Sequence, residues 1–303
     1  MLRLRNAAKK ASDVPSDGKR NDLRAGGGGS ASIADAALRL EKIDADLQAL
    51  IGERLAVSRE ILGNPATSGG ARGLFCESLD EALRACVERY KADAPITTLE
   101  PVWRALAAAA AGDIEIHCET AEDPAALLEA VRYHFGFSIP VEAAGDAPDV
   151  IRAVAENDRA LGLIRLDERA DLPWWRSLGA PAPEIVARLP FLVAEERPAD
   201  MPLIVVAQST GAEERDVAAY DARWRGALPG RLMAGGLEVL AFHRTSEGVD
   251  ALIAARGDHS AGDVARLCAE AGAEPDTLRR VGAYAAPIDI DEAADETWDE
   301  KES

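Results

Sequence analysis

Apolar residues recur at helical spacing in the first part of the chain. Across residues 41–61 they fall at the i, i+3, i+4 and i+7 positions of an amphipathic helix. This pattern predicts a long helix that Ser32 or Asp35 can cap and that ends after Leu62, where a run of helix-breaking residues follows. Arg54 falls inside the apolar stripe, and its place there needs an explanation. The apolar positions are Ile43, Leu47, Leu50, Ile51, Leu55, Val57 and Ile61.

Two shorter helical patterns follow the first one. One covers residues 78–92, and the other runs from the Pro-Ile-Thr-Thr turn at residues 95–98 to Gly112. Two short helices cannot cover the apolar face of a much longer one, so we expect two copies of the chain to pair through this segment. Residues 33–112 are therefore predicted to form a three-helix dimerising segment.

The pattern changes after Gly112, where short strands and helices alternate. Five prolines between Pro173 and Pro198 then interrupt the chain. Residues 113–199 are predicted to be a small α/β segment. Its strand patterns cover residues 113–119, 138–143, 161–166 and about 185–193, and its helix patterns cover residues 124–135 and 147–157.

The next segment, residues 200–288, gives the order strand, helix, strand, strand, helix, strand. This βαββαβ order is typical of a ferredoxin-like fold, which hosts many unrelated sites and identifies no function. The predicted fold class is therefore multi-domain α and α/β, with helical, small α/β and C-terminal ferredoxin-like segments. The strand patterns of the last segment cover residues 201–208, 237–244, 249–256 and 278–287, and its helix patterns cover residues 213–227 and 261–271.

The two ends of the chain have compositions that favour disorder. Residues 1–32 mix charged residues with a run of four glycines, and residues 289–303 carry eight carboxylates and one lysine. The whole chain of 303 residues has 34 basic and 53 acidic residues, which gives a net charge of −19. This charge repels nucleic acid and anionic membranes, so neither is expected as a partner.

Chemistry-bearing side chains are sparse. The four cysteines, Cys76, Cys86, Cys118 and Cys268, lie far apart without the spacing of a metal site, and we expect reduced thiols. The histidines do not cluster with a nucleophile, and no metal or cofactor is expected. No apolar run is long enough to cross a membrane and no secretory signal begins the chain, so we expect a cytoplasmic protein.

Two motifs in the helical segment resemble an enzyme family. The Ile43-Asp44 pair, the leucines after it and the Glu53-Arg54 pair resemble the first helix of the all-helical chorismate mutases. The run LEPVWRALA at residues 99–107 resembles their third helix, with its tryptophan and arginine.

The resemblance continues beyond the helical segment. Residues 129–140 and 149–166 resemble prephenate dehydratases, and residues 236–287 resemble the regulatory ACT domain that ends such enzymes. Module order across residues 33–288 is that of the bifunctional mutase and dehydratase proteins. The dehydratase-like part is too short for two lobes, and Met201-Pro202 stands where that family has a Thr-Arg pair.

The resemblance implies a role in aromatic amino acid biosynthesis, the rearrangement of chorismate to prephenate. That reaction needs no nucleophile or cofactor, because arginines clamp the two carboxylates and cations face the ether oxygen. Arg54 then corresponds to the first-helix arginine, and Arg39 is the nearest candidate for a cation expected at Ala37. The alternative is structural: Arg54 snorkels, or it pairs with Asp44 or Glu81.

Other cations of the family do not match this sequence. The expected lysine falls on Pro65, residues 73–83 hold no arginine, and residues 105–114 hold no polar partner for the ether oxygen. The resemblance therefore implies a mutase with an eroded site and weak or lost activity, unless Arg39, Arg59 or the partner chain supplies the missing charge. The alternative is a non-catalytic descendant that senses a small ligand or binds a partner. The ACT-like turn at Gly235-Gly236 implies at most weak binding of an aromatic amino acid.

Overall fold

The computed structural model describes residues 32–63, 70–89, 96–120, 123–195, 197–209 and 214–290. The chain divides into two compact units, residues 1–47 and residues 48–303. Nearly all of the two predicted disordered tails lies outside the described residues.

The first helix, α1 (Ile33–Leu62), has the bounds that the apolar pattern predicts. Its start is a capping box. The Ser32 hydroxyl accepts a hydrogen bond from the backbone N–H of Asp35 at 3.2 Å, and the Asp35 carboxylate accepts one from the N–H of Ser32 at 3.2 Å. Both residues expected at the cap therefore take part in it.

Two further helices confirm the other helical patterns of this region. The short 3₁₀ helix η1 (Gly70–Phe75) precedes α2 (Glu77–Glu88), and α3 (Ile96–Ala111) follows. The alanines of α3 allow a close approach of the next helix, because a Cβ atom added at Gly136 would lie 3.3 Å from Ala105 Cβ. The predicted continuation of α2 at residues 90–92 lies outside the described residues.

A parallel βαβαβ unit follows, and its helices begin at local sequence signals. Asp123 accepts hydrogen bonds from the backbone N–H groups of Ala125 and Ala126, and Asp146 forms a capping box with Asp149. The elements are β1 (Glu115–Glu119), α4 (Pro124–Phe135), β2 (Val141–Gly145), α5 (Ala147–Glu156) and β3 (Ala160–Arg165).

Strand β6 (Leu203–Ala207) pairs with other strands than the sequence pattern predicts. It lies antiparallel between β3 and β4 (Glu184–Leu189), so it completes the preceding α/β sheet and does not begin the C-terminal antiparallel unit. All five of its residues are buried, as in a central strand, but an apolar run does not specify its neighbours. The chain passes from β4 to β6 within residues 190–202, which hold only the short strand β5 (Leu192–Val193) and no second lobe among the described residues.

The predicted helix at residues 213–227 is wrong. Strand β7 (Val217–Trp224) occupies this stretch and pairs along its whole length with β9 (Gly248–Arg256). Alanines at three of its eight positions favour a helix locally, but pairing with a neighbour on each side and burial of both faces decide for a strand. A 3₁₀ turn, η3 (Met233–Gly235), is the helical element between β7 and β8.

The rest of the C-terminal pattern is confirmed. The elements are β8 (Glu238–Thr245), β9, α6 (Ala261–Ala271) and β10 (Thr277–Tyr284), and the antiparallel order is β10-β7-β9-β8. Gly282 of β10 pairs in parallel with Ile185 of β4, which joins both parts into one nine-stranded sheet. This approach requires glycine, because a Cβ atom at Gly282 would lie 2.3 Å from the Ile185 carbonyl oxygen.

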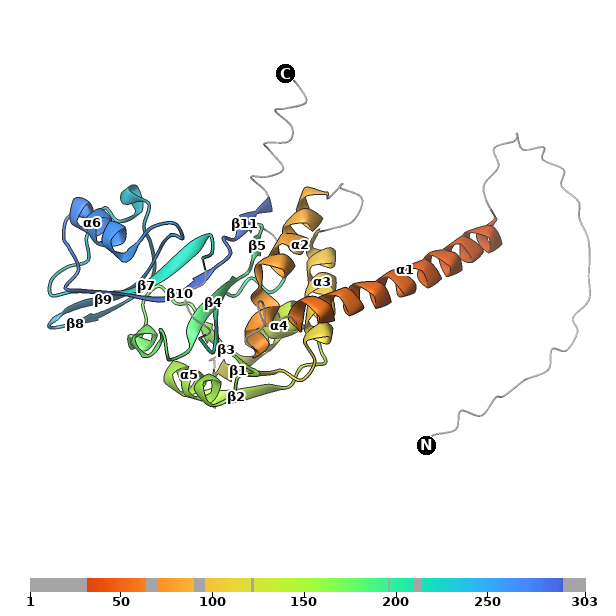
Figure 1. The fold of residues 1–303 in the computed structure, drawn as a ribbon, viewed down its shortest axis with the longest axis horizontal. Helices are drawn as coiled ribbons and strands as arrows, with labels where there is room; N and C mark the ends of the chain where they lie inside the picture. The colour runs from red at the N-terminus through yellow and green to blue at the C-terminus, as the bar shows by residue number, and fades with distance from the viewer. Residues whose placement is uncertain are drawn as a thin grey trace, which may run out of the picture. The chain divides into compact units, whose positions relative to one another are not determined.

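Both faces of the sheet are covered, as the alternation along β6 shows. Leu203 and Val205 pack with α3 and α4, whereas Ile204 and Val206 pack with α5 and the 3₁₀ helix η2 (Trp174–Ser177). Helix α6 covers the β7–β10 part through Val264 and Cys268 (Figure 1). Beyond the large sheet, β5 pairs in parallel with β11 (Ile288–Asp289).

Candidate functional site

Arg54 is a residue of α1, and its side chain lies against Trp103 of α3. Its guanidinium carbon is 5.6 Å from the centre of the Trp103 ring, a cation–π distance. One guanidinium nitrogen, Nη1, is buried and has no hydrogen-bond partner among the described residues. Burial lowers the pKa of Arg54 from its ordinary value. The side chain therefore places a partly desolvated positive charge beside an aromatic ring.

A second arginine, Arg89, affects the pKa of a thiol that Arg54 also affects. Cys86 of α2 is buried, which raises the pKa of its thiol, and the positive charges of Arg89 and Arg54 both oppose that rise. Arg89 follows the last turn of α2 and is exposed. The charges of two arginines therefore act on the pKa of one thiol.

The structural alternatives for Arg54 can be tested against the contacts. No ion pair joins Arg54 to a carboxylate of the described residues, and Glu81 instead lies 3.4 Å from Arg84. The pairing of Arg54 with Glu81 is therefore not found. Asp44 belongs to the other compact unit, residues 1–47.

Arg39 also belongs to residues 1–47 and has an exposed side chain. Arg54 belongs to the other unit, residues 48–303.

The arginines of α2 and α3 contact aromatic rings and a carboxylate outside their own helices. Arg104, the arginine of the third-helix motif, lies 5.9 Å from the centre of the Phe75 ring and 5.4 Å from that of Phe191. Arg84 pairs with Asp216 at 2.6 Å and lies 5.3 Å from the Phe191 ring centre. These contacts bind the helices to the sheet.

A buried polar cluster lies where α3 meets α4. Glu100 is 1% exposed and its carboxylate is 3.1 Å from Arg197 Nη2, while His134 Nδ1 is 3.8 Å from the same carboxylate. The Tyr133 hydroxyl donates a hydrogen bond to the Thr97 carbonyl at 2.9 Å. Burial raises the pKa of Glu100, although Arg197 opposes the rise, and burial lowers the pKa of His134 well below 6.5.

Sequence reasoning missed this cluster. Its members come from three separate segments, and no local spacing connects them. The available signal was Glu100 itself, a carboxylate at a buried position of α3.

Buried ion pairs also join the helical region to the sheet. Asp80 of α2 pairs with Arg215, and Arg72 lies 3.5 Å from Glu184. A cavity of about 610 Å³ beside α2 is lined by charges of both signs, among them Arg84. Pairs of this kind fix the position of the helices but are weak evidence for stability or catalysis.

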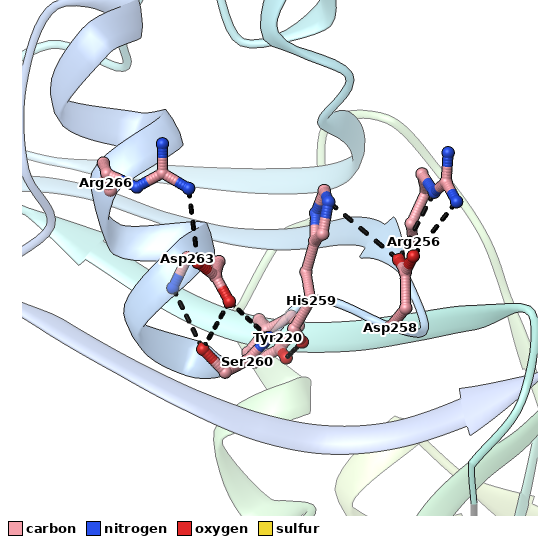
Figure 2. Close-up of polar contacts among 7 residues, drawn as sticks. All are labelled: Tyr220, Arg256, Asp258, His259, Ser260, Asp263 and Arg266. Atoms are coloured by element: carbon pink, nitrogen blue, oxygen red, sulfur yellow. Dashed lines mark hydrogen bonds and ion pairs between the residues drawn. The ribbon is translucent and has the colours of Figure 1, made fainter.

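Several polar groups at the start of α6 bond one another locally, while His259 Nδ1 is buried without a hydrogen-bond partner among the described residues (Figure 2). The Tyr220 hydroxyl donates to the His259 carbonyl at 3.0 Å, and the Ser260 hydroxyl accepts from the Asp263 N–H at 3.2 Å. Arg256 pairs with Asp258 at 3.0 Å. The arrangement caps a helix and closes a turn.

Metal and membrane chemistry find no support in the described residues. No group of three His, Cys, Asp or Glu side chains among them could hold a metal ion, and none of their helices is long and apolar enough to cross a membrane. All four cysteines are buried and none forms a disulfide. The predicted effector turn at Gly235-Gly236 lies at the end of η3, where Gly236 adopts a left-handed conformation.

Among solved structures that match the chain are a dehydratase and a protein described as an acylase. A prephenate dehydratase from Streptococcus mutans is 11% identical, covers 57% of this chain and 99% of its own, and has a TM-score of 0.33. A structure described as GqqA, a novel type of quorum quenching acylase, is 13% identical, covers 60% of this chain and 98% of its own, and has a TM-score of 0.39. Scores this low carry no argument about fold or function. No protein-family model and no curated protein matches the chain.

Proposed function

We propose that the chain is a chorismate mutase relative that binds a small dicarboxylate, chorismate or prephenate, at Arg54 and turns chorismate over slowly or not at all. The observation that carries this proposal is the state of Arg54, whose guanidinium is held against Trp103 with a buried Nη1 that lacks a hydrogen-bond partner among the described residues. Burying an unpaired cation is costly, and a bound carboxylate would supply the missing partner.

The small number of arginines near the proposed site supports the proposal that activity is weak or absent. Arg54 and Arg89 can face two carboxylates, but the rearrangement also needs positive charge at the ether oxygen as the bond breaks. Arg84 already pairs with Asp216, whereas Arg104 lies against the Phe75 and Phe191 rings and its Nε and Nη2 are buried without hydrogen-bond partners among the described residues. Losing one preorganised donor typically lowers the rate by about 10² to 10³, so the loss of more than one leaves little catalysis.

The proposal includes a homodimer through α1. Seven large apolar side chains of this helix are exposed, and an exposed apolar stripe marks an interface more often than free surface. In such a dimer Arg39 of the second copy is the candidate for the missing cation. The seven side chains are those of Ile33, Leu38, Leu40, Ile43, Leu47, Leu50 and Val57.

The module boundaries form part of the same proposal. Residues 33–112 would be the mutase-like module, and a dehydratase-like and an ACT-like module would follow it, with β6 belonging to the dehydratase-like one rather than to the ACT-like one that residues 200–288 were expected to form. The second candidate function is a non-catalytic sensor that uses the same carboxylate site. The buried pairs Asp80–Arg215 and Arg72–Glu184 favour it, because they tie the helices to the sheet in one position.

Arg54→Ala separates a ligand-binding arginine from a structural one. We expect the wild-type chain to bind chorismate in titration calorimetry and to convert it slowly or not at all, and we expect the variant to lose both binding and turnover. The free energy of unfolding should change by no more than about 1 kcal/mol, since the lost stacking on Trp103 is partly offset by removal of a desolvated charge. Arg152→Ala, at an exposed arginine of α5, is the matched control.

Three results would contradict the proposal. Unchanged chorismate binding in Arg54→Ala would move the ligand elsewhere. A loss of roughly 3 to 5 kcal/mol in unfolding free energy would show that Arg54 has a structural carboxylate partner. Rapid turnover by the wild type would instead require a complete cationic site.

A further inference from the structure

A cavity of about 690 Å³ lies beside the amino-terminal ends of the parallel strands β1, β2 and β3. Its wall combines the end of α3 with the start of β1, the loop before β2 and the loop between α5 and β3. Pockets for small molecules measure roughly 300 to 1,000 Å³, so the space suits a ligand of that size. Neither Arg54 nor Arg89 lines it, so it is a separate cavity from the proposed carboxylate site.

Part of the wall is apolar. Ile114 and Ile139 line the cavity and are each 4% exposed, and Pro140 lies beside them. Ala108 and Ala109 of α3 line the same space with side chains of a single carbon. This part of the wall can take the apolar body of a ligand out of water, and the two alanines leave room for it.

The Glu115 carboxylate in the wall is held in a fixed orientation. Asn157 Nδ2 donates a hydrogen bond to Glu115 Oε1 at 2.7 Å, and His117 Nε2 lies 2.9 Å from the same oxygen. The hydrogen bonds of His117 and Asn157 lower the pKa of Glu115, so the group stays ionised. Both contacts use Oε1, and Oε2 has no hydrogen-bond partner among the described residues. One carboxylate oxygen is therefore available to a ligand.

A second source of negative charge is the end of α3. Asp113 follows the helix, lines the cavity and has an exposed carboxylate that forms no ion pair with the described residues. Helix α3 has no basic residue in its last turn, so no side chain of the helix itself offsets the partial negative charge of its carboxyl end.

Arg159 is the one arginine among the residues that line the cavity. Its Nε donates to the backbone carbonyl of Asp113, and its backbone N–H donates to Asn157 Oδ1 at 2.9 Å. Two carboxylates and the carboxyl end of a helix therefore face one guanidinium group. The wall has an excess of negative charge, which attracts a cation.

From this charge and shape we propose that the cavity binds a small organic ammonium ion with an apolar body, of the class of the alkylamines. An ammonium group has three N–H donors, which can reach Glu115 Oε2 and the Asp113 carboxylate, and hydrogen bonds between ions are the stronger ones. The apolar body lies against Ile114, Ile139 and the alanines of α3. That part of the wall offers nothing to a bare metal ion, which needs oxygen, nitrogen or sulfur ligands on every side.

The test compares three probes with the same carbon skeleton: isoamylamine, isoamyl alcohol and isovalerate. Each is titrated into the full chain at about pH 8, where an ordinary histidine is neutral and an alkylamine is charged, at constant ionic strength set with sodium chloride. Calorimetry should show saturable binding of isoamylamine, at least about tenfold weaker binding of the neutral alcohol and none of isovalerate. Isoamylamine should also raise the unfolding temperature, because it binds the folded chain.

A pair of double variants separates this site from the general attraction of a chain with a net charge of −19. Asp113→Asn with Glu115→Gln should weaken isoamylamine binding about tenfold or more. Glu129→Gln with Glu274→Gln removes the same charge at two exposed positions and should leave binding unaltered.

A further variant keeps the charges and removes the space. Ala109→Trp places a large side chain in the cavity from an exposed position of α3, so the chain should still unfold cooperatively while isoamylamine binding is lost. No saturable binding of isoamylamine by the wild type would overturn the proposal, as would equal weakening by the two double variants. Equal binding of all three probes, or tightest binding of isovalerate, would also overturn it. Arg54→Ala should not alter isoamylamine binding, so this site is independent of the proposed mutase site.

Discussion

In α1, Leu50 exposes 61% of its surface and Val57 exposes 55%, whereas Leu252 and Ile253 of β9 are fully buried. The polar groups differ in the same way. Arg54 Nη1 has no hydrogen-bond partner among the described residues, while the Ser260 and Asp263 side chains at α6 bond each other and the helix start. The cap at the start of α6 therefore satisfies its own groups, whereas α1 leaves groups that a second molecule or a ligand could satisfy.

This difference identifies candidate functional positions as those where a group lacks a partner within the chain. A buried group with all its partners in place contributes to folding, whereas an exposed apolar stripe or an unpaired buried cation has a cost that some other contact offsets. For that reason the proposals for a dimer and for a carboxylate ligand both concern α1. The buried strands offer a matched reference for the exposed apolar stripe.

The largest expected effect comes from replacing large apolar side chains by alanine, once in the buried sheet and once on α1. Leu163→Ala, in the fully buried centre of β3, should lower the free energy of unfolding by about 2 to 5 kcal/mol. Leu50→Ala with Val57→Ala should change the stability of the monomer by less than about 1 kcal/mol, because both side chains are exposed within one chain. Urea unfolding at several protein concentrations measures both effects.

The same pair of variants tests the dimer. Sedimentation equilibrium of the wild type should show a dimer, the Leu50 and Val57 variant should shift it towards monomer, and Leu163→Ala should leave association unchanged in the folded fraction. A wild-type chain that sediments as a monomer at micromolar concentration would contradict the interface and leave the exposed stripe unexplained.

Local signals in the sequence predicted the helices well. Helices α4 and α6 have the predicted bounds, because a capping Asp123 or Ser260 precedes each and a glycine follows it. The predictions failed where contacts between residues distant in sequence determine the secondary structure or the strand order. The alanines of β7 favour a helix until β9 and β10 pair on both of its sides, and β6 gives no local sign that its neighbours are β3 and β4.

The candidate site was predictable to the same limited extent. Arg54 could be found because it breaks an apolar pattern within one helix, and the structure places it against Trp103. The cluster of Glu100, His134 and Arg197 could not, since its members are distant in sequence and meet only after the helices pack on the sheet. Charge sets assembled by tertiary packing leave no spacing to detect.

An intermediate effect is expected from pH at the buried His134. Burial lowers its pKa well below 6.5, so below pH 6.5 the unfolded chain binds a proton that the folded chain does not. The free energy of unfolding should therefore fall as pH falls, by about 1.4 kcal/mol per pH unit from this group. His134→Gln should flatten the curve of unfolding free energy between about pH 6.5 and pH 5.

The neighbouring Glu100 acts with the opposite sign. Burial raises its pKa above 4.5, so its folded form binds a proton more readily and its contribution to stability grows as pH falls. Comparison of wild type with His134→Gln isolates the histidine, because both chains keep Glu100. His117→Gln, at a half-buried histidine that contacts Glu115, is the control. Parallel pH curves for wild type and His134→Gln would show that His134 does not titrate as a buried neutral group.

The smallest effect should come from the locally satisfied end of α6. Ser260→Ala removes the hydroxyl that accepts from the Asp263 N–H and donates to its carboxylate, and should cost about 1 kcal/mol of unfolding free energy. Ser246→Ala, at an exposed turn position, should change it by less than about 0.5 kcal/mol. Because the cap satisfies only its own helix, Ser260→Ala should leave chorismate binding and dimer association unchanged when measured on the same samples. A loss of chorismate binding or of dimer association in Ser260→Ala would mean that α6 is coupled to α1. The two regions would then not be independent of each other.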